Sequence, residues 1–185
     1  MAIGSLPAAS QPVVRYHVSQ RAMHWVMALM IILAIAIGLY CSYLGRGSAE
    51  RQFLMDIHKS LGMTVLALMV IRIPLRGVYG QPASSVKAPW SEKAASVAVH
   101  AALYTLMLVM PLSGYATSSL EGRTVPWFGF FNWPNLLHDD PSLGRAIGAI
   151  HEYSGYALIG LLAMHLVAVV WHRFLRRDEV LSRML

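Results

Sequence analysis

Residues 149–174 read AIHEYSGYALIGLLAMHLVAVVWHRF, an apolar stretch that is long enough to cross a bilayer as one helix and yet carries three histidines. His151 and His165 are 14 residues apart, and His172 follows seven residues later. Each residue of an α-helix turns by about 100°, so the three imidazoles fall on one stripe, the first two separated by about 21 Å of rise. An ionisable group in lipid is costly and normally faces a partner or a cofactor. The stripe therefore indicates two cofactors stacked along the membrane normal.

The composition of the whole chain is that of a membrane protein. Of 185 residues, 56% are hydrophobic and only 13% are charged, and the mean hydropathy is +0.51. The single cysteine, Cys41, excludes an internal disulfide, a thiolate metal cage and covalent attachment of c-type haem. The sequence remains compatible with a noncovalent cofactor held by histidines.

Four apolar stretches predict an all-α fold, an integral membrane four-helix bundle that forms a single domain over residues 1–185. The helices are expected at about 22–44, 53–76, 92–119 and 149–174. The first 14 residues, small and polar, are expected to form a tail. Pro74 and Gly77 are expected to help end the second helix.

The basic residues predict the orientation of the bundle. A net charge of +6 could suit nucleic acid, but most basic residues flank the spans, so lipid rather than nucleic acid is the expected partner. Of fifteen lysines and arginines, ten fall on the side of the two chain ends, which places both termini in the cytoplasm of a bacterial inner membrane. These ten are Arg15, Arg21, Arg72, Arg76, Lys87, Lys93, Arg173, Arg176, Arg177 and Arg183.

Antiparallel helices bring the membrane histidines to two matched depths. His24 and His165 are expected near the inner face, and His58 and His151 near the outer face. His100 and His172 fall towards the inner face as further histidines.

The segment between the third and fourth helices, residues 120–145, is polar at both ends and centred on PWFGFFNWP, residues 126–134. Such an aromatic run is typical of a segment at the membrane interface, which serves as a belt, a lid or a docking surface.

Several motifs in order resemble the bacterial cytochrome b561 family. They are RAMHWVMA (21–28), HKSLG (58–62), VIRIPLR (70–76), MPLSG (110–114), PWFGF (126–130) and HEYSG with the later MH and WH of the last helix. The resemblance covers about residues 16–185. Proteins of this family are four-helix membrane cytochromes with two haems b, and they are related to the cytochrome b subunits of hydrogenases and formate dehydrogenases.

The resemblance implies two noncovalent haem b groups, each held by two histidines. His24 and His165 match one axial pair of the family, and His58 and His151 match the other, which agrees with the pairing by depth. Two neutral imidazoles leave no open position on haem iron, and such iron is suited to electron transfer.

Other polar residues in the spans have more than one interpretation. His100 is a packing residue, a contact for quinone or a haem propionate, or an axial ligand. His172 is either a side chain that reaches the inner interface or part of a quinone site. Arg72 is a determinant of topology or, because arginine pairs strongly with carboxylates, the partner of a haem propionate.

Two functions are consistent with these patterns. In the first, the protein passes electrons between the periplasmic face and the quinone pool, with ubiquinone as acceptor, and acts as a superoxide:quinone oxidoreductase. Lys59, Arg46, Arg51 and Arg145 would then attract superoxide to the outer site. In the second, it is a non-enzymatic cytochrome b subunit or docking partner that relays electrons from a dehydrogenase, another cytochrome or a periplasmic redox protein, and Asp139 and Asp140 would face a basic partner.

Overall fold

The computed structural model describes residues 13–82 and 89–185, which form four long helices and one small hairpin. The helices are α1 (Val18–Tyr43), α2 (Ala49–Tyr79), α3 (Trp90–Leu120) and α4 (Pro141–Val170), which continues into a π-helical turn, η1 (Trp171–Arg176). Residues 1–12 of the expected N-terminal tail, and Lys87, lie outside the described residues.

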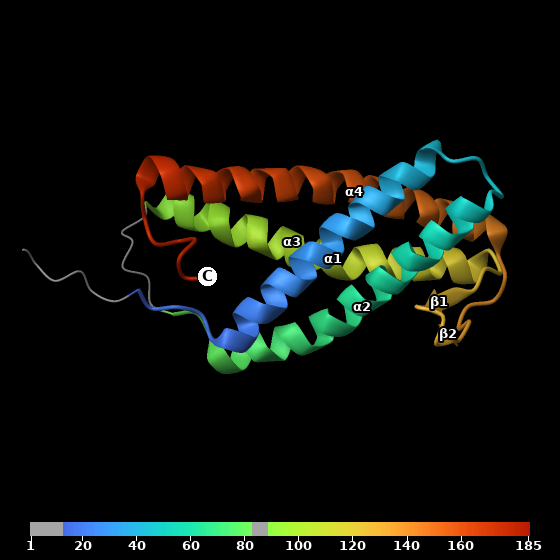
Figure 1. Ribbon diagram of the computed structural model, residues 1–185, viewed down its shortest axis with the longest axis horizontal. Helices are drawn as coiled ribbons and strands as arrows, with labels where there is room; N and C mark the ends of the chain where they lie inside the picture. The colour runs from blue at the N-terminus through green and yellow to red at the C-terminus, as the bar shows by residue number, and fades with distance from the viewer. Residues whose placement is uncertain (1–12, 83–88) are drawn as a thin grey trace, which may run out of the picture.

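Successive helices run in opposite directions, and each packs mainly against the helices that precede and follow it in the chain (Figure 1). All four are long and apolar enough to cross a membrane, so the expected all-α bundle of four spans is confirmed. The start of α1 and the C-terminus lie at one end of the bundle, which we call the termini end (Figure 1). The other end carries the strands and is called the hairpin end. Large apolar side chains along all four helices are exposed, as expected for surfaces that face lipid.

The second helix is longer than expected. Pro74 lies inside α2, which ends at Tyr79 with Gly80 as its C-cap at φ of 61°, so the expectation that Pro74 and Gly77 help to end it was wrong. A positive φ is open to glycine at little cost, which explains the position of the end.

The fourth helix also starts earlier than expected, at Pro141 instead of residue 149. The Asp140 carboxylate accepts hydrogen bonds from the backbone N–H groups of Ser142 and Leu143, both at 3.0 Å, and so caps the helix. A hydrogen bond from the Ser142 hydroxyl is the main reason that the pKa of Asp140 lies below its ordinary value. Because its carboxylate is used as a cap, Asp140 is a poorer candidate for the docking contact considered above.

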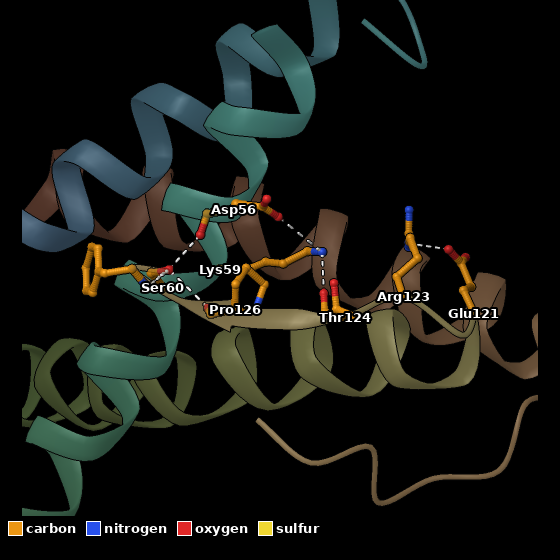
Figure 2. A network of polar contacts seen from close by, with 8 residues as sticks. Asp56, Lys59, Ser60, Glu121, Arg123, Thr124 and Pro126 are labelled. Carbon is orange, nitrogen blue, oxygen red and sulfur yellow. Dashed lines mark hydrogen bonds and ion pairs between the residues drawn. The ribbon is translucent and has the colours of Figure 1, made fainter. Parts of the chain in front are cut away.

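The aromatic run forms a structure that the sequence analysis did not foresee. Strands β1 (Val125–Trp127) and β2 (Phe131–Trp133) pair antiparallel, with Trp127 opposite Phe131. The buried Ser60 hydroxyl of α2 holds the hairpin, since it lies 3.0 Å from the Pro126 carbonyl and accepts the Phe128 N–H at 2.9 Å (Figure 2). The hairpin is therefore fixed to the bundle.

Between the two ends of the bundle lies a layer of apolar side chains. Its buried members are Met27, Val65 and Met69, with further methionines and leucines packed around them. Thioether side chains are flexible and fill irregular gaps, which suits a space between three helices.

We predict that Met69→Ala destabilises the protein by about 2–5 kcal/mol, because its fully buried side chain would leave a cavity. Unfolding in mixed detergent micelles measures this change. The neighbouring Val70→Ala is the control, because Val70 is 64% exposed on the lipid-facing side. Equal losses in both variants would contradict a special role for the layer.

Candidate functional site

The membrane histidines come together in two pairs, one towards each end of the bundle. At the hairpin end the ring centres of His58 and His151 are 6.1 Å apart. Towards the termini end the ring centres of His24 and His165 are 6.5 Å apart. The structure thus brings together the same partners that depth alone suggested.

Each histidine pair lies at one depth of the bundle, which we call a level, and all four helices contribute to each level. Every helix contributes two positions that are 14 residues apart, one to each level, and 14 residues correspond to about 21 Å of rise. The hairpin-end level consists of Gly38, His58, Gly114 and His151, and the termini-end level of His24, Arg72, His100 and His165.

Backbone carbonyls orient both imidazoles of the hairpin-end level. His58 Nδ1 lies 2.9 Å from the Ala34 carbonyl oxygen, and His151 Nδ1 lies 2.9 Å from that of Met110. A carbonyl only accepts, so each Nδ1 donates its hydrogen. Each neutral ring then keeps a lone pair on Nε2, the tautomer that binds a metal through that atom.

Two glycines make room for these rings. A Cβ on Gly38 would lie 3.1 Å from His58 Cε1, and one on Gly114 would lie 3.0 Å from His151 Cε1. Both distances are shorter than ordinary carbon contacts, so larger residues would press on the imidazoles.

A cavity of about 170 Å³ lies beside this pair and is lined by His58 and His151. The rest of its wall is mostly small or apolar, with three hydroxyl-bearing residues, Tyr115, Thr117 and Ser118, and two cations, Lys59 and Arg123. The Lys59 ammonium donates to the Thr124 carbonyl at 2.8 Å, and Arg123 pairs with Glu121 (Figure 2). Of the cations expected here, Arg46, Arg51 and Arg145 do not line the cavity, and Arg51 donates to the Cys41 carbonyl.

Side chains rather than carbonyls surround the termini-end pair. Arg72 Nη2 lies 3.4 Å from His24 Nδ1, and Arg72 Nε donates to the Tyr104 hydroxyl at 3.1 Å. Arg72 Nη1 is buried and has no hydrogen-bond partner among the described residues. A buried donor without a partner is costly and fits an acceptor that the protein itself does not supply.

The two other histidines also lie towards the termini end. The ring of His100 is 5.5 Å from that of His165, and its Nδ1 donates to the Ser96 carbonyl at 2.6 Å. His172 Nδ1 lies 2.6 Å from Asp178 Oδ2, in the segment that follows η1. Sequence reasoning missed Asp178, because its contact depends on how the chain turns at Arg177, where φ is 54°.

The geometry of both pairs suits one metal between two imidazoles. A metal–imidazole bond is about 2 Å long, so rings on opposite sides of one metal have centres roughly 6 Å apart. The observed separations, 6.1 and 6.5 Å, agree with this. The glycine contacts, the apolar cavity and the free Arg72 donor also suit an apolar macrocycle with carboxylate arms.

Residues 15–185 match the family described as prokaryotic cytochrome b561. The chain belongs to this family. It is 30% identical over 171 residues to cytochrome b561 homolog 2 of Escherichia coli K12, covering 92% of this chain and 91% of that protein. It is 29% identical over 174 residues to cytochrome b561 homolog 1 of the same organism, with 92% and 97% covered. It is 27% identical over 175 residues to a Yersinia pestis protein named probable superoxide oxidase CybB, with 92% and 96% covered.

Family membership confirms the resemblance seen in the sequence. This b561-family protein is a multi-pass membrane electron carrier, and the family implies haem b as its cofactor. The residues at both levels fit that cofactor.

We predict that Gly114→Ala weakens haem retention at the hairpin-end level, because the new methyl group would push the His151 ring from its position. Haem content and the low-spin spectrum after purification measure the effect. Gly160→Ala in α4 is the control, since a Cβ there would meet nothing within 4 Å. Normal haem content in both variants would show that the close approach is not needed.

Proposed function

We propose that this cytochrome b561 holds two haems b, one between His58 and His151 and the other between His24 and His165, and passes electrons across the membrane. The observation that carries this proposal is the pair of matched levels, each with two imidazoles at the separation that one metal requires. Haem held by these histidines would supply an iron that exchanges single electrons with little rearrangement.

At the hairpin-end level the protein orients the two imidazole rings, and at the termini-end level it provides a positive charge for the cofactor. The carbonyls of Ala34 and Met110 fix the two rings with Nε2 available. Arg72 is proposed to bind a haem propionate through its partnerless Nη1, because an arginine–carboxylate pair satisfies a buried donor well.

The proposed orientation puts both termini in the cytoplasm and the hairpin end at the periplasmic face of a bacterial inner membrane. Support comes from the excess of basic residues beside the termini end, which is the arrangement that sets topology. Fusion of reporter enzymes to the connections at each end tests the orientation.

Quinone, with ubiquinone as the expected acceptor, is proposed to bind at the termini end beside His100 and His172. Quinone reduction takes up protons, so the site needs a proton donor at the edge of the membrane. The Asp178 carboxylate accepts the Nδ1–H of His172, which orients this imidazole and leaves its Nε2 for a ligand. His100 is exposed and its Nδ1 is already satisfied by Ser96, so its Nε2 is available to a ligand.

Two electron donors are considered for the hairpin end. Superoxide is favoured by Arg123, a half-exposed cation in the cavity wall, and by the name of the Yersinia pestis relative. A dehydrogenase or a periplasmic redox protein is the alternative, with this chain as a non-enzymatic relay. Stopped-flow mixing with superoxide distinguishes them, because a relay would show no fast haem reduction under those conditions.

We predict two low-spin haems per chain and independent loss of each. His151→Ala should remove the haem of the hairpin-end level and leave the other, while His165→Ala should do the reverse. Pyridine haemochrome assays and low-temperature spectra of the purified variants measure this. One haem per chain in the wild type, or loss of both in either folded variant, would contradict the proposed pairing.

We predict that His172→Ala slows reoxidation of reduced haem by a soluble quinone analogue roughly 10²-fold or more, the usual size of a general-acid contribution, while both haems stay bound. Stopped-flow absorbance follows the reoxidation. The control is His138→Ala, because His138 is an exposed residue at the hairpin end. Unchanged rates in His172→Ala and in the double variant with His100→Ala would place the quinone elsewhere.

A further inference from the structure

Lys59 is a cation with too few partners for its burial. Its side chain is only 15% exposed, although it carries a full charge. The ammonium makes one hydrogen bond, to the Thr124 carbonyl at 2.8 Å, and its ion-pair partner Asp56 is 3.9 Å away. That second distance is beyond hydrogen-bonding range, so two of its three donors have no partner among the described residues.

The surroundings of Lys59 show where an additional partner would lie. Figure 2 shows the Lys59 side chain running from α2 towards Thr124, just before the hairpin, and Asp56, its other contact, is 54% exposed. Lys59 also lines the cavity beside His58 and His151, and that cavity has no carboxylate in its wall. Burying an ammonium is costly unless an anion and hydrogen bonds compensate it. An anionic group on a ligand in the cavity would supply the partner that Lys59 lacks.

The cavity wall divides into two chemically different parts. Met63, Pro111 and Gly114 are among its apolar and small residues, and the two cations Lys59 and Arg123 lie where α2 meets the segment before β1. Arg123 is a weaker partner for a ligand than Lys59, because it already pairs with Glu121 and its side chain is 52% exposed. A ligand with an apolar body, a metal centre and carboxylate arms matches this division.

We propose that Lys59 binds a carboxylate of the haem held by His58 and His151, with Arg123 as a second, more exposed cation, and so turns the carboxylate edge of that haem towards the β1–β2 hairpin. This inference rests on the proposed function. It makes Lys59 a binding residue for the cofactor rather than an attractor of soluble anions. It also gives the haem of this level a defined direction, with its carboxylate edge against the hairpin.

The test is the midpoint potential of each haem in the purified holoprotein, with the two haems distinguished by the His151→Ala variant. A positive charge beside a haem stabilises the electron that the haem accepts. Removing that charge therefore lowers the reduction potential of the haem. Lys59→Gln should therefore shift the reduction equilibrium of the hairpin-end haem at least tenfold towards the oxidised form, which for one electron is about 59 mV. The other haem should be unchanged, and Lys59→Arg should restore the potential.

Two further variants control for folding and for general charge. Arg123→Gln changes a half-exposed residue outside the helices and should fold normally, with a smaller shift in the same direction. Arg46→Gln removes an exposed charge from the same end without touching the cavity, and should leave both potentials unchanged. Unchanged potentials in Lys59→Gln and in the Lys59→Gln, Arg123→Gln double variant, with both haems bound, would overturn the inference.

The source of the anion is tested separately. If Lys59 serves a soluble anion, Lys59→Gln would slow haem reduction by dithionite, an anionic reductant, but not by an uncharged reductant, and would shift the reduction equilibrium of that haem by much less than tenfold. That result would overturn the inference without affecting the proposed haem pairing. Absence of a haem at this level in the wild type would instead contradict the proposed function itself.

Discussion

An imidazole inside a bilayer has to find its partners within the protein, because hydrocarbon offers none. This constraint organises the bundle. The rings of His58 and His151 reach backbone carbonyls of the neighbouring helices, Ala34 on α1 and Met110 on α3. Such contacts require helices to approach closely, and the approach is possible because Gly38 and Gly114 stand against the rings. Helix packing and the tautomers of the two histidines are therefore parts of one arrangement.

The histidines of the two levels are held by different kinds of contact. At the hairpin end, main-chain atoms hold the rings, and these atoms cannot move without moving a helix. At the termini end, the long side chain of Arg72 lies between His24 and Tyr104 and keeps one donor without a partner. A flexible arginine can adjust to a bound group more easily than a carbonyl can. The hairpin-end site is thus the more rigid of the two.

The apolar stretches were sufficient to predict four spans, and the histidine spacing to predict which histidines would meet, because a regular helix converts residue number directly into depth. The same 14-residue spacing also links His24 to Gly38 and His100 to Gly114, and it could have pointed to both glycines. The Asp140–Pro141 pair is a readable start of α4 that the prediction overlooked. The carbonyl partners, the Asp178 contact and the Ser60–hairpin bonds could not be predicted, because they depend on the way distant segments pack.

The methionine layer between the two levels has an energetic consequence. Apart from Tyr104, whose hydroxyl binds Arg72, the described residues of the layer around Met27 and Met69 are apolar and carry no group that could pass on a proton. In the proposed function, charge would cross this layer as electrons, and the protons taken up by quinone would come from the termini side. In the proposed orientation each electron moves towards a negatively charged cytoplasm, against about 2.3 kcal/mol for every 100 mV if it crosses the whole membrane potential. A larger membrane potential would then slow electron transfer through the protein, so that its turnover falls when the respiratory chain is most active.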